Sequence, residues 1–512
     1  MLRTAMLLLV ACLVVPVFAT PSFQYQLATG GDFESGLTAW AARDQSTQGA
    51  WSATGLTRLP VSGRATPGPA LGRSFAATDG HGWDTCVLTQ KFSVSYACTV
   101  AVGFDVFANE WAAPAKACPE GIGYRDGLRP ARLKTPGWRV DILKQTADPF
   151  SIAAPDIVSH VCAGAGSKVV FQRSPGWTHR CILLSLQPGD YTLRLGVLAD
   201  LDAFNAGFDN VSLSAGHPHH EIVFDSSRNN TATPALTDVY LYNQTMNFID
   251  PTPGLNSPTA SDSCPALSAD GHYIVFRSGR TSIYHPTLYL WDRVTRALAP
   301  LPGLASGASE SFPSISADGR FIAFTSDRPG VTGGAGDFDI FLYDRNTSSI
   351  VPLPGLNSAK AEMCPSISAD GRLIAFASSR TGNCDIYLYD RETRSLVNLP
   401  GINNPNFDDL YPSLIADGHF IAFQSKRIGP GNGDIYLYDL TTKALVATPN
   451  LNTADEELTP SISWDGRYIA FGYRLHVDGK DEDIRCYDRT TGAIVTLGAI
   501  NSKSYDGEPM MR

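Results

Sequence analysis

Apolar and polar residues alternate in short runs through the second half of the chain, and the runs recur in a fixed order. Residues 313–324 read PSISADGRFIAF, in which two alternating runs flank an Asp-Gly pair. Alternation with a period of two is typical of strands with one buried face, and Asp-Gly supplies positive φ values that favour a tight turn between them. A third run such as DIYLYD (385–390) and a fourth such as SLVNL (395–399) complete the unit. We therefore expect four strands in each unit.

The unit is nearly complete in five copies. Their Asp-Gly pairs are spaced by 48, 52, 47 and 48 residues and begin at Asp270, Asp318, Asp370, Asp417 and Asp465. Four strands in a repeat of this length are typical of β-propeller blades. Residues 221–256 lack only the first strand of a unit, and DGEPMMR at 506–512 matches that missing strand. We expect the C-terminal strand to complete the first blade and close a ring of six, which removes exposed sheet edges.

The pattern PSISADGR followed by DIYLYD resembles the six-bladed propeller of the TolB family. The resemblance spans residues 221–512 and rests on the five nearly complete copies. It implies the propeller fold, but propellers of this kind serve as binding platforms and also as parts of enzymes. The TolB family carries a different N-terminal domain, so the resemblance does not imply a role in the Tol envelope system.

Residues 22–215 lack the repeat and hold six of the eight Trp residues. Short alternating runs such as WRVDIL (138–143), split by Gly and Pro, predict a β-sandwich, so the whole chain is expected to be all-β. TGGDFESGLTAW (29–40) and NAGFDNVSL (205–213) resemble the two ends of jelly-roll carbohydrate-binding modules of the galactose-binding-like type. That resemblance implies a structural calcium held by Asp32, Glu34 and Asp209, oxygen ligands that suit this ion. The alternative is a solvated turn and an Asp at a strand end.

The first residues, MLRTAMLLLVACLVVPVFAT, have the layout of a secretory signal peptide, residues 1–19. Arg3 precedes a short apolar run, and cleavage is expected near Ala19. A lipoprotein box ending at Cys12 is the weaker alternative, because little apolar chain precedes that cysteine. No later run approaches the roughly 18 apolar residues of a membrane span. We expect a secreted or periplasmic protein, with a His-rich linker at residues 216–220 joining the sandwich to the propeller.

The length, charge and cysteine content of the chain limit its domain organisation, its partners and its disulfides. The 512 residues exceed what one hydrophobic core usually supports, which agrees with two domains. The formal charge is −10 and Lys/Arg runs are absent from the sequence, so a nucleic-acid partner is not expected. Nine of the ten cysteines remain after the expected cleavage. Because nine is odd, at least one thiol is free or paired between chains.

An acidic residue stands three positions before the proline of every unit. If these carboxylates ring one mouth of the central channel, their negative potential favours a metal ion or a cationic peptide. In the alternative, each carboxylate accepts hydrogen bonds from backbone N–H groups of its own interblade loop. The six candidate ligand-binding residues are Asp262, Glu310, Glu362, Asp409, Glu457 and Asp506.

Five units carry an arginine after the second strand and five carry an aspartate before the third, but only four carry both: the second unit has Thr287 at the aspartate position, and the last has Arg474 one place early. Pairing of these two residues within each blade is expected to stabilise an irregular turn. The arginines are Arg228, Arg280, Arg328, Arg380 and Arg427, and the aspartates are Asp238, Asp339, Asp385, Asp434 and Asp483.

An enzyme needs different residues in different roles, whereas the repeat supplies copies of one residue. Neither a G-x-S-x-G nor an H-E-x-x-H motif occurs in the sequence. We therefore predict an exported, non-catalytic binding protein. Its sandwich would engage a glycan or cell-surface polymer, and its propeller a protein or peptide. The alternative is a polysaccharide-acting enzyme, a glycoside hydrolase or lyase, whose catalytic residues lie on the variable loops.

Overall fold

The structure is a computed structural model of the chain. It describes residues 39–44, 51–54, 75–78, 84–94, 98–110, 137–147, 157–164, 178–199, 204–215, 221–228, 236–244, 247–329, 338–427, 433–475 and 482–511. The predicted signal peptide, the predicted linker, Asp32 and Glu34 lie outside these residues. Every regular element in the described part of the chain is a β-strand, which confirms the all-β prediction.

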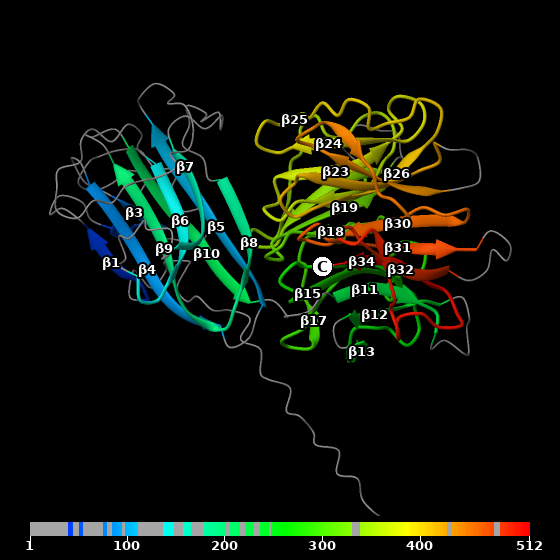
Figure 1. Ribbon diagram of the computed structural model, residues 1–512, viewed down its shortest axis with the longest axis horizontal. Helices are drawn as coiled ribbons and strands as arrows, with labels where there is room; N and C mark the ends of the chain where they lie inside the picture. Colours follow the sequence, from blue (N-terminus) through cyan, green and yellow to red (C-terminus); the bar gives the residue numbers. More distant parts are fainter. Residues whose placement is uncertain are drawn as a thin grey trace, which may run out of the picture.

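The first half forms two five-stranded antiparallel sheets, which lie together on the left of Figure 1. In spatial order, one sheet contains β1 (Ala41–Asp44), β4 (Asp84–Val94), β9 (Gly189–Ala199), β6 (Gly137–Lys144) and β7 (Ile157–Gly164). The other contains β2 (Trp51–Thr54), β3 (Phe75–Thr78), β10 (Phe204–Ala215), β5 (Cys98–Glu110) and β8 (Thr178–Leu186). Alternate residues of the long strands, such as Val100, Val102 and Phe104 in β5, are buried and form the core.

The described part of the second half forms six four-stranded sheets, which we call blades one to six (Figure 1). Blade one contains β34 (Asp506–Met511), β11 (Glu221–Ser226), β12 (Asp238–Asn243) and β13 (Phe248–Asp250). Blade two contains β14 (Asp262–Leu267), β15 (Tyr273–Ser278), β16 (Thr287–Asp292) and β17 (Ala297–Ala299). Blade three contains β18 (Glu310–Ile315), β19 (Phe321–Ser326), β20 (Asp339–Asp344) and β21 (Ser349–Val351).

Blades four to six continue the same order of strands. Blade four contains β22 (Glu362–Ile367), β23 (Leu373–Ser378), β24 (Asp385–Asp390) and β25 (Ser395–Leu396). Blade five contains β26 (Asp409–Leu414), β27 (Phe420–Ser425), β28 (Asp434–Asp439) and β29 (Ala444–Val446). Blade six contains β30 (Glu456–Ile462), β31 (Tyr468–Arg474), β32 (Glu482–Asp488) and β33 (Ala493–Val495).

Hydrophobic clusters join each blade to its neighbours. Each cluster takes buried residues from two adjacent blades, and this holds for all six adjacent pairs. The C-terminal strand β34 pairs antiparallel with β11, with Met511 opposite Ile222. Blade one also shares a buried cluster with blade six, in which Phe224 and Ile484 take part. The strands therefore bury their apolar faces between blades.

The Asp-Gly turns differ in detail from the expected tight turn. Only the glycine has a positive φ, 73° at Gly319. Asp318 accepts hydrogen bonds from the Ser316 hydroxyl and the Arg320 backbone N–H, at 2.8 and 3.0 Å. The Ser316 N–H donates to the Phe321 carbonyl, so four residues form the loop. Asp318 thus stabilises the loop through its side chain rather than through its backbone conformation.

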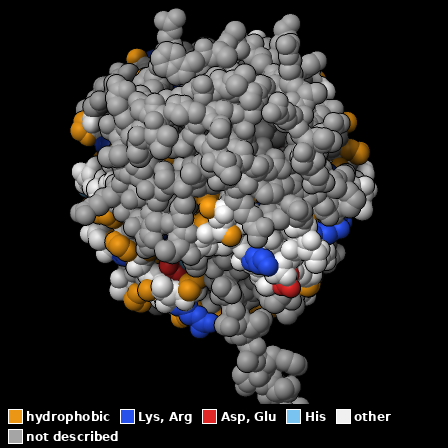
Figure 2. All heavy atoms as spheres, turned by 90° about the vertical axis from the view of Figure 1, so that its left-hand side faces the viewer, with side chains coloured by type: hydrophobic (Ala, Val, Ile, Leu, Met, Phe, Trp, Pro, Cys, Tyr) orange, Lys and Arg blue, Asp and Glu red, His pale blue; other side chains and the backbone are white. Residues whose placement is uncertain are grey.

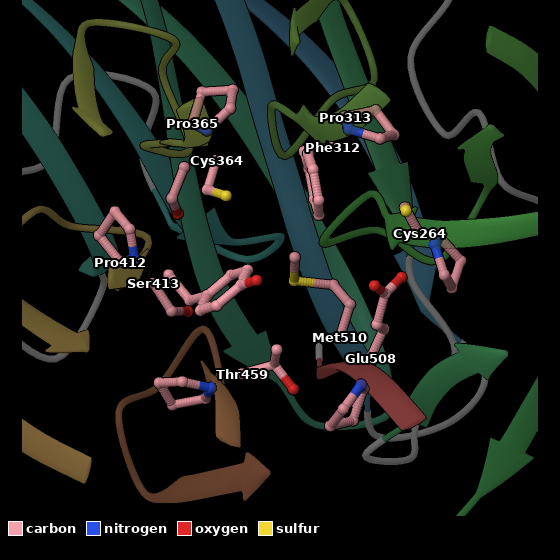
Figure 3. Close-up of a pocket in the computed structure, with 15 residues that line it drawn as sticks. Cys264, Phe312, Pro313, Cys364, Pro365, Pro412, Ser413, Thr459, Glu508 and Met510 are labelled. Carbon is pink, nitrogen blue, oxygen red and sulfur yellow. The ribbon is translucent and has the colours of Figure 1, made fainter. Parts of the chain in front are cut away.

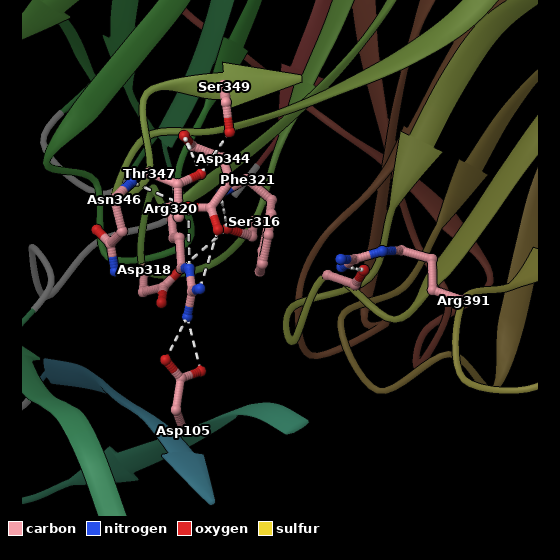
Figure 4. Close-up of polar contacts among 11 residues, drawn as sticks. Asp105, Ser316, Asp318, Arg320, Phe321, Asp344, Asn346, Thr347, Ser349 and Arg391 are labelled. Carbon is pink, nitrogen blue, oxygen red and sulfur yellow. Dashed lines mark hydrogen bonds and ion pairs between the residues drawn. The ribbon is translucent and has the colours of Figure 1, made fainter. Parts of the chain in front are cut away.

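Arg320 in the same turn contacts the sandwich. Its Nη1 lies 2.7 and 2.8 Å from the two carboxylate oxygens of Asp105 in β5. Its Nε and Nη2 donate to Asp344 of its own blade, as Figure 4 shows. Asp105 is buried by these contacts. Among the described side chains visible from the sandwich side in Figure 2, hydrophobic and charged groups of both signs are mixed.

Candidate binding site at the channel mouth

The six predicted acids stand at the first residue of the innermost strands, except in blade six, where the acid is the second residue. All six side chains are 0% exposed: Asp262, Glu310, Glu362, Asp409, Glu457 and Asp506. Each accepts a hydrogen bond from a backbone N–H of its own interblade loop, as from Ser358 to Glu362 at 2.9 Å. The other donors are Ser257, Ser306, Asn404, Thr453 and Ser502. These acids are absent from the lining of the cavity on the propeller axis. The contacts agree with the second interpretation, in which the carboxylates stabilise the loops.

Five of the acids also pair with the arginine that follows the second strand. Arg380 Nη2 lies 3.1 Å from Glu362 Oε1 and 2.6 Å from the Leu356 carbonyl oxygen. Its guanidinium lies 5.3 and 4.6 Å from the ring centroids of Phe376 and Tyr387, within the range of cation–π attraction. We call this arrangement the arginine brace. Its other arginines are Arg228, Arg280, Arg328 and Arg427.

The prediction that these arginines pair with the aspartate before the third strand is wrong. The guanidinium lies over the aromatic rings of the second and third strands and reaches the acid on the first strand. In blade four, Asp385 instead accepts a hydrogen bond from the Thr381 hydroxyl at 2.5 Å. Sequence proximity therefore suggested the wrong carboxylate.

Blade six lacks the brace. Leu475 stands at the position of the arginine, and Arg474, one place earlier, pairs with Glu456 and Glu482 at 3.3 and 3.0 Å. Glu457 accepts from the Thr453 N–H and hydroxyl, while its Oε2 has no hydrogen-bond partner among the described residues. Burial accordingly raises the pKa of Glu457.

The residue two positions after each acid has a left-handed backbone. φ lies between 43° and 52° in all six blades, and the pairing register shifts at this point. Such a shift marks a β-bulge, which redirects side chains. Positive φ in residues other than glycine costs of order 1–3 kcal/mol. We call these residues the channel-mouth ring: Cys264, Phe312, Cys364, Tyr411, Thr459 and Glu508.

The ring and the proline after each of its members line a cavity on the propeller axis (Figure 3). Its empty volume is about 570 Å³, part of which is open to solvent. The lining is mostly apolar and includes Met510. The ring centroids of Phe312 and Tyr411, from blades three and five, lie 6.3 Å apart. Because all six innermost strands contribute, the cavity is the mouth of the central channel.

The ring is not symmetric in charge. Burial raises the pKa of the Cys264 thiol well above its ordinary value, and the Glu508 carboxylate raises it further. The pKa of Cys364 is raised by the same two causes in the same order. Burial also raises the pKa of Tyr411 to about 12. Glu508 is the one carboxylic acid in the ring, and its Oε2 has no hydrogen-bond partner among the described residues.

Serine hydroxyls join the blades behind the ring. Ser366 Oγ accepts a hydrogen bond from the Leu414 N–H of the next blade at 2.9 Å. Equivalent contacts are made by Ser314, Ser413 and Ser461. These contacts fix the innermost strands relative to one another, so the ring side chains have a rigid support.

The remaining sequence predictions concern metals, cysteines and membranes. The backbone of Asp209 lies in β10 opposite Asp105, next to a register shift, and the calcium site stays a prediction. Within the described ranges, no three His, Cys, Asp or Glu side chains are placed to hold a metal ion. Cys486 is buried, and burial raises its pKa to about 12, as expected of an inert thiol. No helix in the described part of the chain is long and apolar enough to cross a membrane.

Comparison with known proteins gives likeness in fold only. No family model and no curated protein matches the chain. TolB from Acinetobacter baumannii is 19% identical with a TM-score of 0.44, over 57% of this chain and 66% of that one. A protein assigned as TolB from Agrobacterium tumefaciens is 17% identical with a TM-score of 0.40, over 55% and 88%. An oligogalacturonate lyase in complex with manganese is 11% identical with a TM-score of 0.38, over 53% and 73%.

Sequence reasoning selected the acids and missed the ring. A usable signal was present, because the residue before the proline varies between copies of the unit: CP, FP, CP, YP, TP and EP. The inward direction of that residue depends on the bulge, which the alternation of PSIS does not reveal. The repeated acid contacts its own interblade loop, and the variable residue two positions later lines the cavity.

Proposed function

We propose that this chain is an exported, non-catalytic binding protein whose propeller binds a protein or peptide at the channel mouth. The observation that supports it is the channel-mouth ring. All six blades keep a costly backbone conformation there, yet they present five different kinds of side chain. A purely structural position would be filled by copies of one residue, as the arginine braces are. Differing side chains on a common backbone are what selective recognition requires.

Selection of phage-displayed decapeptides on the full chain tests this proposal. Phe312→Ala/Tyr411→Ala removes two aromatic walls of the cavity, and Leu298→Ala/Leu445→Ala removes two exposed side chains on outer strands. We expect enriched peptides to lose at least tenfold in affinity for the first variant and to keep it for the second. Equal binding to both variants, or no enrichment, would contradict the proposal.

The proposal extends to the sandwich, whose two sheets we interpret as a jelly roll that engages a glycan or surface polymer. Its calcium would be held by Asp32, Glu34 and Asp209, oxygen ligands of the kind calcium prefers. We likewise interpret β34 as the strand that closes a ring of six blades. A glycan array of the full chain, with and without chelator, tests the first two points; no glycan bound in either condition would contradict them. Depolymerisation of polygalacturonate or another polysaccharide would overturn the non-catalytic assignment.

A further inference from the structure

The negative charge at the channel mouth is concentrated on the side of blades one and six. Glu508 lies in β34 of blade one, and its carboxylate lies beside Cys264 at the cavity wall (Figure 3). Its Oε2 is buried and has no hydrogen-bond partner among the described residues. Leaving a buried charged acceptor unpaired costs more than 1–3 kcal/mol. Glu508 therefore lines the cavity with a carboxylate whose hydrogen-bonding capacity the described residues do not fill.

A second buried carboxyl group lies on β11, the strand that pairs with β34. Asp225 in β11 is 2% exposed, pairs in register with Gly507, and has an Oδ1 without a hydrogen-bond partner in the described part of the chain. Burial, and next Glu508 and Glu482, raises the pKa of Asp225 well above its ordinary value. Because the charge of Glu508 contributes to this shift in the pKa of Asp225, a cation at Glu508 would offset that contribution.

The protein's own cations contact other groups. Arg474 pairs with Glu456 and Glu482. Arg277 Nη1 contacts the Ser263 hydroxyl at 3.4 Å. No ion pair joins Glu508 to any described Lys, Arg or His, in contrast to the five braced acids. The chain leaves this carboxylate available to a cation from outside.

The other walls of the cavity suit a long basic side chain. Phe312 and Tyr411 present aromatic rings, which attract a cation within about 6 Å of the ring. The prolines and Met510 offer apolar surface to the methylene groups of such a side chain. We propose that the channel mouth recognises a lysine or arginine side chain in an extended segment of the partner protein, with Glu508 as its counter-ion. This inference rests on the proposed function and names the chemistry of its ligand.

The test uses synthetic copies of the decapeptides enriched on the full chain. Each basic residue is replaced in turn by norleucine, for lysine, or citrulline, for arginine, which keep the length and remove the charge. Affinities are measured by calorimetry for the wild type, for Glu508→Gln, and for Asp417→Asn. Asp417 is an exposed carboxylate in the Asp-Gly turn at the other end of the innermost strand of blade five, so its variant has the same change in net charge.

We expect one basic residue to be required, and Glu508→Gln to weaken binding at least tenfold while Asp417→Asn changes it less than twofold. Replacing the required basic residue of the peptide should cost little further affinity when the protein is Glu508→Gln, because the two changes remove the same contact. This inference would be overturned, and the proposed function would stand, by either of two results. In the first, the peptides require the aromatic walls for binding but no basic residue. In the second, they bind Glu508→Gln as tightly as the wild type. Peptides that do not need the aromatic walls would overturn both.

Discussion

Blades one to five and blade six share one backbone design but stabilise it differently. In the first five, a buried acid, an arginine and two aromatic rings form one unit. In blade six, Leu475 replaces the arginine and Glu457 is left with one buried unpaired oxygen. The same sheet forms in both cases, so the brace is not needed to specify the blade. What blade six lacks is the cation beside its buried acid; an unpaired oxygen alone does not set it apart, because Oε2 of the braced Glu310 also has no hydrogen-bond partner among the described residues.

The loss of a brace should have the largest effect. Arg380→Ala leaves the buried Glu362 carboxylate without its cation, which typically costs about 3–5 kcal/mol. The matched change in blade six is Arg474→Ala, whose side chain is 38% exposed and which should cost less than about 1 kcal/mol. Urea unfolding of the full chain measures both. Similar losses in the two variants would remove the distinction between braced and unbraced blades.

A second comparison between the blades concerns the arginine that follows the Asp-Gly pair in blades three and six, which in blade three contacts the sandwich. Arg320→Ala removes the cation that Asp105 and Asp344 share and should destabilise the protein by about 3 kcal/mol. Arg467 holds the equivalent position in blade six, is 45% exposed and pairs with Asp488 of its own blade, so Arg467→Ala should destabilise the protein much less than Arg320→Ala. Thermal unfolding compares the two. An equal effect would show that Asp105 adds nothing to the Arg320 contact.

Glu482 gives blade six its own dependence on pH. Burial raises its pKa from 4.5 to about 7, despite Arg474. A raised pKa means that the folded state holds the proton more tightly, so this stability is present below pH 4.5 and is lost as the pH rises to about 7. The loss amounts to roughly 3 kcal/mol. In Glu482→Gln the loss should be absent, and unfolding free energies at pH 4.5, 6 and 7.5 measure the difference. Parallel pH profiles for the two proteins would contradict this account.

Installing a brace in blade six should have the smallest effect. Leu475→Arg places a guanidinium at the position from which the other five arginines reach their acids. We expect a gain of about 1 kcal/mol, the net value of a typical hydrogen bond, because Tyr473 occupies the position of the serine that contacts each arginine elsewhere. Leu475→Lys, which lacks the planar fork, is the control. A loss of stability in Leu475→Arg alone would mean that Glu457 is not accessible to it.

Within the propeller blades, the sequence was sufficient for the strands and their order, because alternation and repetition act locally; the order of the strands in the sandwich sheets did not follow from it. The pairing of β34 with β11 also followed from a missing strand at one end and a spare strand at the other. The site did not follow, since the positive φ of residues such as Phe312 and Tyr411 is imposed by the bulge and not by residue type. The Arg320–Asp105 contact joins residues far apart in sequence, so no local sequence pattern predicts it.

Mapping where a selected peptide touches the protein tests the central claim most directly. A peptide enriched on the full chain is synthesised with a photoreactive phenylalanine, cross-linked to the full chain, and the modified residues are identified by mass spectrometry. We predict cross-links at the channel-mouth ring and at the residue that follows each of its members, the ring being Cys264, Phe312, Cys364, Tyr411, Thr459 and Glu508. Cross-links confined to the outer strands β17, β21, β25, β29 and β33 would contradict the assignment of the channel mouth as the binding site.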